Sequence, residues 1–533
     1  MSYAIIKRTG GNLKDIGRTF TAVFVIIAAL VIYATLGRIV DEQRTQIGTN
    51  KALGFFNKEV LSKYLMFGLS GTVAGAVIGT VLGYYVILPI VMKSYANNYV
   101  YGAGKYFFEP YLAVIVIGAA IVLSAVTIVF SCLTMLTTNA ITLLAPPVPK
   151  THKHHGHDGP SLFLYPKLII LNMLSDKKRV IATVVSVLGC CTLMAAGFGM
   201  QYAIKNSITD QFNMYEHYDY KVKYNSEINP DVHDQLLEAL DDNGTRYIAL
   251  SDHYRPAKIG QTTTAIELVC TDLDEINDFF TLNDAATGTH IGSSRPGLWI
   301  HQKLSEYYDV HPGEILTVYD GKLNPYEIEI IGIYENYLGF YSFLTPETYV
   351  SVFGEEPEYN SFLIFENEQG SPDLASDINT IEGIKEFKNN IDLKNYYLDL
   401  ASSLDALAIL FIAMSAMLAY FILLNLVSML VNQKKKELTI MRINGFSLMK
   451  TINYVASELA VSTVIGIILG LICGNALEMT ILKLLESDQI MFERGIQWNG
   501  CLYAALITIF FTVLVSAPIF RKIKYLQLTD MTS

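Results

Sequence analysis

Histidines gather in one short segment, and they are the first residues whose types and spacing suggest chemistry. The sequence THKHHGHD at 151–158 contains His152, His154, His155 and His157. Imidazole nitrogens are ligands for zinc and nickel, so the cluster offers a candidate metal site. It lies between APPVPK and GPSLFLYP, however, and such a Pro- and Gly-rich linker has no rigid scaffold to fix the ligand geometry. We therefore interpret the segment as a solvated linker and predict neither a metal site nor a cofactor.

Motifs for catalysis are missing from the rest of the sequence. A phosphate-binding loop needs GxxxxGK[ST], whereas GGNLKDIGR at 10–18 has the wrong spacing and lacks the lysine and the hydroxyl that would hold phosphate and magnesium. The sequence also contains no HExxH, GxSxG or CxxC pattern. These absences predict that the chain is not itself an enzyme.

Two short polar segments share one arrangement of basic and glycine residues. They are EQRTQIGTNKALGFFNKEV at 42–60 and KKKELTIMRINGFSLMK at 434–450. A shift of 391 residues aligns Lys51 with Arg442 and the pair Gly54-Phe55 with Gly445-Phe446. The same shift superposes a second set of glycines without a gap, namely Gly75, Gly79 and Gly83 on Gly466, Gly470 and Gly474. Glycines four residues apart lie along one face of a helix, where another helix backbone can approach closely. We interpret these glycines as helix-packing residues, although glycine is also common in membrane helices.

The elements that must position these segments are membrane helices. The chain is 51% hydrophobic and only 17% charged, whereas soluble domains are nearer a quarter charged. Its apolar runs are long enough to cross a bilayer, and the two longest exceed the bilayer thickness, which implies tilt or an extension beyond the lipid. We predict seven spans, at about 20–38, 63–92, 111–137, 180–203, 404–431, 453–485 and 500–520.

Charge predicts the orientation of the chain in the membrane. Lys and Arg gather in short cytoplasmic loops, and with seven spans the basic segments 39–62, 138–179 and 432–450 fall on the same side as the C-terminal tail. Residues 204–402 contain 35 Asp and Glu but only 12 Lys and Arg, so this block is predicted to be extracytoplasmic. The acidic balance of the whole chain reflects this block and does not indicate a nucleic-acid partner.

The extracytoplasmic block has the pattern of an α+β domain. Alternating residues predict strands at 327–336 and 361–367, and DGKLNP at 320–325 predicts a hairpin turn. The aromatic residues Tyr334, Tyr337, Phe340 and Tyr341 fit either a strand core or an exposed patch for a peptide, and we favour the core. The predicted fold class is therefore a membrane α-helical protein of about seven spans in two related modules, with one α+β extracytoplasmic domain.

The first polar segment resembles a known family. EQRTQIGTNKALGF is similar to the cytoplasmic loop signature of FtsX/MacB-like permeases, the membrane subunits of type VII ABC transporters. The tandem resembles the long two-module permeases of Gram-positive bacteria, and VCTDLDEINDFF resembles the outer domain of the family. The resemblance implies these domains: an N-terminal segment 1–18, a first permease domain 19–140, a cytoplasmic linker 141–179, a transmembrane helix 180–203, an extracytoplasmic domain 204–402, and a second permease domain 403–533.

The resemblance also implies a role for the two polar segments. In such permeases the loop after the second span of each module forms a short coupling helix that docks on a separate ABC ATPase, here expected in two copies. An apolar stripe with Lys51 facing the partner, and a helix end at Gly54 with positive φ, agree with this role. Charges that only anchor helix ends at membrane lipids are the alternative. The candidate coupling residues are Gln46, Ile47, Gly48, Lys51, Ala52, Leu53, Gly54, Glu437, Leu438, Arg442 and Gly445. The second copy has Thr439 for Gly48 and Asn444 for Leu53, so we expect the two sites to differ in strength.

The start of the sequence fits the family incompletely. Residues 1–18 would lie outside the membrane although they carry Lys7, Arg8, Lys14 and Arg18, against the charge rule. They resemble the tail of an outer domain, so the first module would lack its first span and first outer domain. We expect a shortened or split permease, whose missing span is lost or comes from a further polypeptide.

Two functional hypotheses follow from the resemblance. The first is the membrane subunit of an ABC transporter, which couples ATP hydrolysis by a separate subunit to movement of the outer domain, for export, extraction or mechanical signalling. Its cargo would be a peptide, a lipoprotein or an antimicrobial compound. The alternative is a non-transporting signalling or scaffold protein that regulates a cell-wall hydrolase or a sensor kinase.

Overall fold

The chain folds into two compact units. The computed structural model describes all residues except 1–16, 19–20, 23, 30–31, 34, 38, 41–42, 91–109, 145–176, 226–227, 243–244, 261, 293–294, 367–373, 487–489 and 524–533. The first unit, here called the helical unit, comprises Met1–Gln201, Ser403–Leu484 and Ile496–Ser533. The second, called the sheet unit, comprises Tyr202–Ser402 and Leu485–Gly495. The histidine segment 151–158 and residues 1–16 lie outside the described residues.

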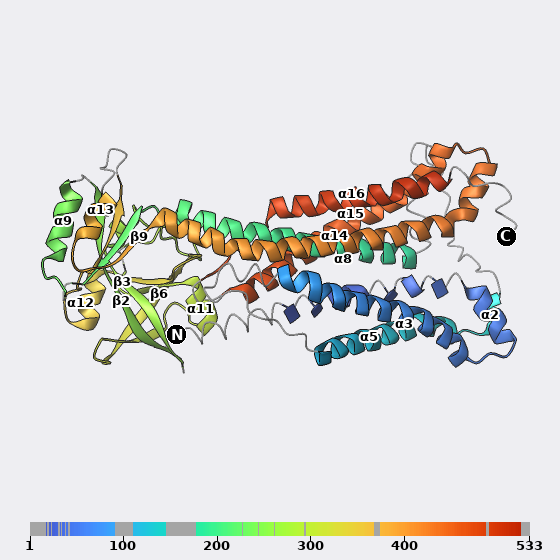
Figure 1. The fold of residues 1–533 in the computed structure, drawn as a ribbon, viewed down its shortest axis with the longest axis horizontal. Helices are drawn as coiled ribbons and strands as arrows, with labels where there is room; N and C mark the ends of the chain where they lie inside the picture. The colour runs from blue at the N-terminus through green and yellow to red at the C-terminus, as the bar shows by residue number, and fades with distance from the viewer. Residues whose placement is uncertain are drawn as a thin grey trace, which may run out of the picture. The chain divides into compact units, whose positions relative to one another are not determined.

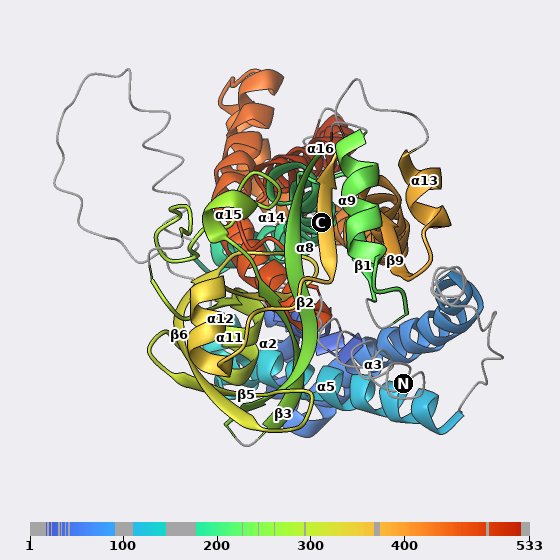
Figure 2. The ribbon, with the colours of Figure 1, turned by 90° about the vertical axis from the view of Figure 1, so that its left-hand side faces the viewer.

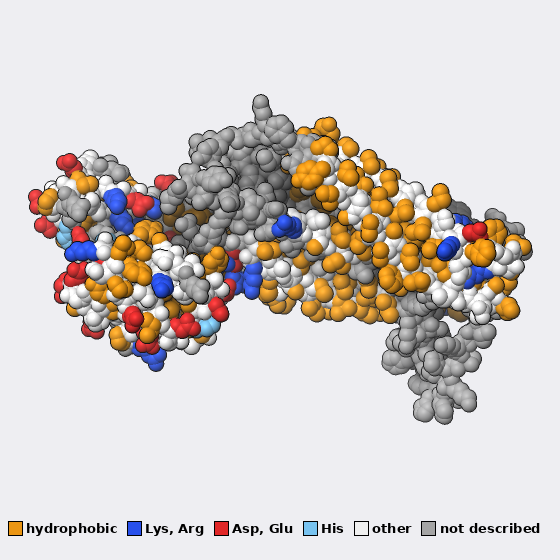
Figure 3. Space-filling view, turned by 90° about the horizontal axis from the view of Figure 1, so that it is seen from below, with side chains coloured by type: hydrophobic (Ala, Val, Ile, Leu, Met, Phe, Trp, Pro, Cys, Tyr) orange, Lys and Arg blue, Asp and Glu red, His pale blue; other side chains and the backbone are white. Residues whose placement is uncertain are grey.

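The helical unit is built from long apolar helices, and Figure 3 shows hydrophobic side chains over much of its visible face. Among the described residues, six helices are long and apolar enough to cross a membrane: Asn57–Ile90, Ala113–Leu133, Thr183–Tyr215, Ala408–Ser428, Leu448–Leu485 and Trp498–Pro518. They confirm six of the seven predicted spans. The first predicted span, 20–38, includes residues outside the described part of the chain, and it is not one of the six. The elements of this unit and their bounds are α2 (Arg44–Ala52), α3 (Asn57–Leu82), η1 (Gly83–Ile87), α5 (Pro110–Leu136), α6 (Ala140–Leu144), α8 (Lys177–Asp210), α14 (Asn390–Ile443), α15 (Leu448–Leu485) and α16 (Trp498–Ile523).

The second module packs around α8. In Figure 1, α8, α14, α15 and α16 run side by side. Buried Cys191 of α8 lies in one apolar cluster with Leu423 of α14, Leu459 of α15 and Val515 of α16. Because every neighbouring helix contributes to this cluster, α8 is the central helix of the module.

The first module packs α3 against α5, which lie side by side in Figure 1. The contact is close at Gly68, where a Cβ would lie 2.5 Å from the Ile128 side chain. Thr72 and Ser124 share a hydrogen bond of 3.0 Å between their hydroxyl groups in the same contact. Small and hydroxyl side chains thus hold these two helices together, as is common between membrane helices.

The sheet unit contains nine described strands in the order β3-β7-β4-β6-β5-β2-β8-β1-β9. Strand β3 also pairs with β2, so six of the strands close into a ring, and long β2 continues into the sheet with β8, β1 and β9 (Figure 2). The strands are β1 (Tyr220–Tyr224), β2 (Arg246–Ile259), β3 (Thr262–Cys270), β4 (Leu298–His301), β5 (Ile315–Tyr319), β6 (Pro325–Tyr334), β7 (Tyr341–Leu344), β8 (Ser361–Phe365) and β9 (Ile384–Asn389). The remaining elements are η3 (Gln211–Tyr215), α9 (Val232–Asp242), α10 (Leu273–Ile276), α11 (Gln302–Tyr308), α12 (Pro346–Phe353) and α13 (Leu374–Thr380).

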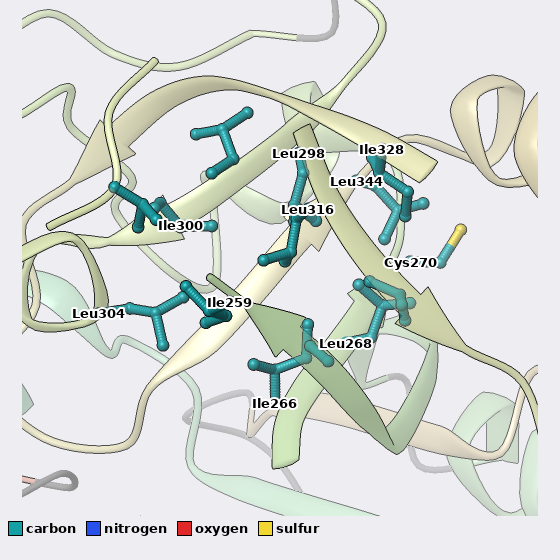
Figure 4. Close-up of a cluster of buried hydrophobic side chains, with 14 of the residues drawn as sticks. Ile259, Ile266, Leu268, Cys270, Leu298, Ile300, Leu304, Leu316, Ile328 and Leu344 are labelled. Atoms are coloured by element: carbon teal, nitrogen blue, oxygen red, sulfur yellow. The ribbon is translucent and has the colours of Figure 1, made fainter. Parts of the chain in front are cut away.

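Besides a cluster that includes Phe280, Phe343 and Leu363, two apolar cores stabilise the sheet unit. Figure 4 shows the one inside the ring, where Leu298, Leu316 and Ile328 from different strands meet. The other lies where α9 and α13 cover β1 and β8. The predicted α+β class is confirmed, and so is the hairpin, because β5 and β6 pair antiparallel on either side of residues 320–324.

The segment Leu485–Gly495 belongs to the sheet unit because ion pairs fasten it there. The fully buried carboxylate of Glu486 accepts from Lys303 and, at 2.7 Å, from Arg494, which also contacts Glu306. A backbone bridge joins Ile490 to Leu338. The connection between α15 and α16 is therefore part of the sheet unit rather than a free loop.

Candidate functional site

The first candidate coupling segment ends in a well-defined helix cap. Gly54 has φ +94°, which confirms the predicted positive φ. The Phe55 N–H donates to the Asn50 carbonyl and the Gly54 N–H to the Lys51 carbonyl, both at 3.1 Å. These two bonds form a Schellman motif, which ends a helix and turns the chain. The chain then enters α3, where Glu59 accepts from the Phe56 N–H at 2.8 Å.

The second segment has the same cap at the end of a different helix. Gly445 has φ +86°, and its N–H donates to the Arg442 carbonyl while the Phe446 N–H donates to the Met441 carbonyl, again at 3.1 Å. However, the expected separate short helix is wrong for this copy. The segment is the last part of α14, a helix of 54 residues that begins at Asn390. Its candidate residues therefore sit on the end of a long helix.

Lys51 does not face outward as expected. Its ammonium group donates to the backbone carbonyls of Leu136 at 2.6 Å and Thr138 at 2.9 Å. Leu136 is the last residue of α5 and Thr138 lies two residues beyond it, where the helix dipole favours a cation. The aligned Arg442 is exposed. The two cations thus differ in environment, and Lys51 positions the end of α5 instead of offering a free charge.

Apolar residues of the first segment point in two directions. Ile47 is buried among residues of α3 and α5, and a Cβ on buried Gly48 would lie 3.0 Å from Leu143 of α6. Gln46 is exposed beside Lys63, and Ala52 is exposed as well. The apolar side chains left outside the fold are Leu53, Phe55 and Phe56, with exposures of 72%, 52% and 75%. We call these three residues the first corner.

The second segment presents an equivalent surface. Leu438 is fully buried in a cluster with Leu430, Val431 and Val455, whereas Glu437 is exposed. The exposed apolar side chains here are Ile440, Ile443, Phe446 and Met449. We call these four residues the second corner. Both modules therefore expose apolar side chains around a Gly-Phe turn.

A buried ion pair supports the second corner. Lys434 and Glu458 are 1% and 3% exposed, and their charged groups are in contact. The ammonium group of Lys434 also lies 4.4 Å from the centre of the Tyr454 ring. The pairing was missed because the two residues lie 24 positions apart on different helices.

The predicted helix-packing glycines fall into two groups. Gly466, Gly470 and Gly474 of α15 are buried against α8. At Gly75, Gly79 and Gly83, no described neighbour lies within 4 Å of the point that a Cβ would occupy. The structure thus places the second set in a helix contact and leaves the first set open among the described residues.

A cavity of about 510 Å³ in the sheet unit is a second candidate site, which the sequence did not predict. Its lining is rich in aromatic and charged side chains, including Tyr254, Tyr307, Phe340 and Tyr341. Tyr334 and Tyr337 are buried instead, which agrees with a core role for those two. The predicted aromatic group is therefore divided between core and cavity.

Lys221 and Lys223 line one wall of this cavity, and both pair with a carboxylate next to it. The carboxylate of Asp252 contacts Lys221 at 2.8 Å and Lys223 at 3.0 Å, and Lys221 also lies over the Tyr341 ring at 4.6 Å. Burial by itself raises the pKa of Asp252, but the two ammonium groups outweigh it and lower this pKa to about 2. The ammonium groups of Lys221 and Lys223 are therefore partly neutralised by the neighbouring carboxylate of Asp252.

Glu216 also lines the cavity. Burial raises the pKa of its carboxyl to about 7, although hydrogen bonds from Gln211 at 2.9 Å and Tyr218 at 3.0 Å oppose the rise. Burial also lowers the pKa of His301, which stacks on Phe340 with ring centres 4.1 Å apart, to about 3. Burial is thus the main cause of both pKa shifts, and it favours the neutral forms of Glu216 and His301.

Comparisons with known proteins bear on the membrane segments. The FtsX-like permease C-terminal family matches residues 18–140 and 409–528. No curated protein matches the chain. Among solved structures, the extracellular domain of the noncanonic ABC-type transporter YknZ from Gram-positive bacteria is 19% identical and covers 32% of this chain and 98% of its own, with a TM-score of 0.22.

The predicted family resemblance is confirmed by the match of both membrane segments. The described residues include six helices that are long and apolar enough to cross a membrane, and two segments match a permease family, so the chain is a multi-pass membrane protein.

Proposed function

We propose that this chain, an FtsX-like permease with two matching C-terminal domains, is the membrane subunit of an ABC transporter whose ATPase is a separate subunit. Two ATPase copies would dock, one at the first corner and one at the second. ATP-driven motion of the corners would reach the sheet unit and act on an extracytoplasmic cargo. The chain itself supplies binding surfaces and mechanical connection, and the hydrolysis takes place on the partner.

The observation that carries this proposal is the repeated Gly-Phe corner. Two segments 391 residues apart have the same cap hydrogen bonds at the same distances and leave apolar side chains exposed. An exposed apolar group next to polar residues is typical of a docking surface for another protein. If these segments only anchored helix ends at lipid headgroups, their cations would have to reach the headgroups. The ammonium group of Lys51 instead binds a backbone carbonyl at the end of α5.

Helix continuity supports the transmission of motion. α14 runs from Asn390 to Ile443 without interruption, so one helix contains residues of the sheet unit and ends at the second corner. A continuous helix is stiff over such a length compared with a loop. The first corner has no equivalent among the described residues, which supports unequal contributions of the two sites.

The sheet-unit cavity supports a peptide as the cargo. Aromatic rings such as Tyr254 and Tyr307 offer flat apolar contacts, and the carboxyl and ammonium groups at its walls can pair with peptide charges and amides. A lipid chain would favour a more uniformly apolar lining. We therefore favour a peptide over a lipoprotein acyl chain.

The coupling proposal is tested with the corner side chains rather than with Lys51. Lys51→Glu would place a carboxylate against two carbonyls and damage α5, so loss of coupling would have two explanations. Leu53→Asp and Phe446→Asp change exposed side chains only. We expect each variant to lower stimulation of the copurifying ATPase in liposomes, and the double variant to abolish it, because desolvating a carboxylate at an apolar interface is costly.

Ile228→Asp is the matched control, since Ile228 is 62% exposed and lies in the sheet unit. Membrane abundance of every variant should stay near that of the wild type. Full ATPase stimulation by the double variant would show that the corners are not docking sites.

Transport and signalling are separated by a second measurement. Release of labelled peptide from membranes is compared with and without ATP, using the wild type and the double corner variant. ATP-dependent release that the double variant lacks supports transport. Normal ATPase stimulation without any release would favour the signalling or scaffold hypothesis.

A further inference from the structure

The cavity of the sheet unit has a charge composition that differs from that of the block around it. Residues 204–402 contain 12 Lys and Arg against 35 Asp and Glu. The cavity lining includes three carboxyl side chains but four lysines, namely Lys221, Lys223, Lys303 and Lys388. One third of the basic residues of the block thus line one cavity, together with less than a tenth of its acidic residues.

Two of these lysines lie opposite each other in the sheet. β1 and β9 pair antiparallel, and Lys221 of β1 is directly opposite Lys388 of β9. Lys223 lies two residues from Lys221, so its side chain is on the same face of the strand. Like charges directly opposite each other on paired strands are destabilising. The wall of the cavity therefore contains an unfavourable pair of charges, and a bound anion would relieve their repulsion.

Buried carboxylates hold three of the lysines from outside the cavity. Asp252 contacts Lys221 at 2.8 Å and Lys223 at 3.0 Å, and Glu486 contacts Lys303. The side chains of Asp252 and Glu486 are 0% exposed, and neither is among the described residues that line the cavity. An ammonium group has three N–H donors, so a single carboxylate contact leaves further donors for a ligand. A ligand would thus meet lysine side chains whose positions are already fixed.

The three carboxyl groups of the lining are engaged or favoured in their neutral form. Glu267 lies 3.6 Å from the ammonium group of Lys221 and accepts from the Tyr254 hydroxyl at 2.7 Å. Glu386 pairs with Lys388 at 2.7 Å. Burial raises the pKa of Glu216 and favours its neutral form. The lining therefore offers positive charge to a ligand more readily than negative charge.

We infer that the cavity binds a short peptide through a carboxylate, either an acidic side chain or a free C-terminus. The inference rests on the proposed peptide cargo and specifies the chemistry that recognises it. The lysines of β1 and β9 would bind the carboxylate. The apolar part of the peptide would pack on Tyr254 and Tyr307, whose exposures of 67% and 61% leave ring surface for a ligand. A volume of about 510 Å³ has room for only a short segment of a peptide.

Two other ligands fit the lining less well. A cationic peptide would bring its ammonium groups toward four lysines. An anionic phospholipid shares the negative charge, but its acyl chains would favour a more uniformly apolar lining.

The test measures peptide binding to the purified full chain in detergent by isothermal titration calorimetry, without ATPase or ATP. The first probe is a four-residue peptide of two leucines and two glutamates, acetylated and amidated at its ends. We expect it to bind about tenfold more tightly than the same peptide with glutamines, because hydrogen bonds to charged groups are stronger than neutral ones. The glutamine peptide with a free C-terminus should recover part of the affinity if the site also accepts a terminal carboxylate.

Variants of the cavity locate the binding. Lys388→Gln removes a lysine whose side chain is 46% exposed, so the fold should be kept, and it should weaken binding of the glutamate peptide about threefold. Glu386→Gln removes the carboxylate that competes for Lys388 and should strengthen binding. Lys322→Gln is the matched control, because it changes the net charge equally at an exposed lysine outside the cavity lining. Binding of the glutamine peptide should be the same in all three variants.

Four results would overturn the inference. Equal affinities for the glutamate and glutamine peptides, or tighter binding of a lysine peptide, would exclude recognition of a carboxylate. Equal weakening by Lys388→Gln and Lys322→Gln would indicate long-range attraction rather than a site. Tighter binding of dioctanoyl phosphatidylglycerol than of the glutamate peptide, with the same loss in Lys388→Gln, would assign the cavity to a lipid headgroup. Because no ATPase is present, unselective peptide binding would leave the transporter proposal standing, and failed ATPase coupling would leave this inference standing.

Discussion

The two permease modules of this chain have the same local design and different surroundings. Each ends a helix with a Schellman cap at a glycine of positive φ and exposes apolar residues beside it. In the first module the preceding helix is α2, of nine residues, and in the second it is α14, of 54 residues. The comparison shows that the few residues of a helix cap determine the geometry of the cap. They do not determine the length of the helix that it ends or the helices that pack against it.

Aligned positions also use different chemistry for the same structural task. Lys434 and Glu458 form a buried ion pair in the second module. The aligned residues of the first module are Gln43 and Phe67, and Gln43 instead accepts a hydrogen bond from Tyr64 at 2.9 Å. Both arrangements join the end of one span to the start of the next. One relies on charge and the other on neutral hydrogen bonds.

The largest effect is expected from breaking the ion pair. Lys434→Met would leave the buried Glu458 carboxylate without its cation, which costs about 3–5 kcal/mol in comparable buried pairs. We expect a lower unfolding temperature in detergent and reduced abundance in the membrane. Lys434→Met combined with Glu458→Leu should recover most of the loss, and exposed Arg442→Met should cause little. A single variant as stable as wild type would show that the pair does not support the second corner.

The next largest effect is expected from substitutions of the helix glycines, which should lower stability in α15 but not in α3. Gly470→Val places side-chain atoms where a Cβ alone lies 2.7 Å from the Cys191 Cβ. Such overpacking costs about 1–3 kcal/mol. Gly79→Val meets no described neighbour and should leave the unfolding temperature of the purified chain nearly unchanged. An equal decrease in unfolding temperature for the two variants would show that the glycines of α15 and α3 do not differ in packing.

The corners should respond alike to loss of glycine. Gly54→Ala and Gly445→Ala force a Cβ into a left-handed backbone, at a cost of about 1–2 kcal/mol. Since neither site has a described neighbour within 4 Å, conformational strain is the only term and should be the same in both. Amide hydrogen exchange of the capped helix ends reports this local loss. A much larger effect at one corner would contradict the equivalence of the two caps.

The smallest effect should come from Lys51. Lys51→Met removes a cation from the end of α5, where the interaction with the helix dipole and its carbonyls contributes about 0.3–1 kcal/mol. We expect faster amide exchange near residues 133–138 and no change in the second module. Lys51→Arg should preserve most of the protection. If exchange there is unaffected by Lys51→Met, the lysine does not hold the end of α5.

The sequence by itself determined the features that depend on neighbouring residues. Apolar runs predicted seven spans, of which the described residues contain six, and the positive φ predicted at Gly54 is found there and at the aligned Gly445. Both follow from local physics, since span length depends on contiguous apolar residues and a left-handed cap depends on the absence of a Cβ. The repeat at a shift of 391 residues was visible for the same reason.

Only the tertiary structure decided which of these features meet. The glycine patterns of α3 and α15 are alike in sequence, yet only that of α15 has α8 against it. The sequence predicted that Lys51 faces a partner, whereas its ammonium group binds a backbone carbonyl at the end of α5. The ammonium group of Lys434 pairs with the carboxylate of Glu458, which lies on another helix. Each of these contacts joins segments that lie far apart in the chain. The free energy of such a contact depends on a neighbour that no local sequence pattern specifies. Similar segments therefore have different packing and different partners.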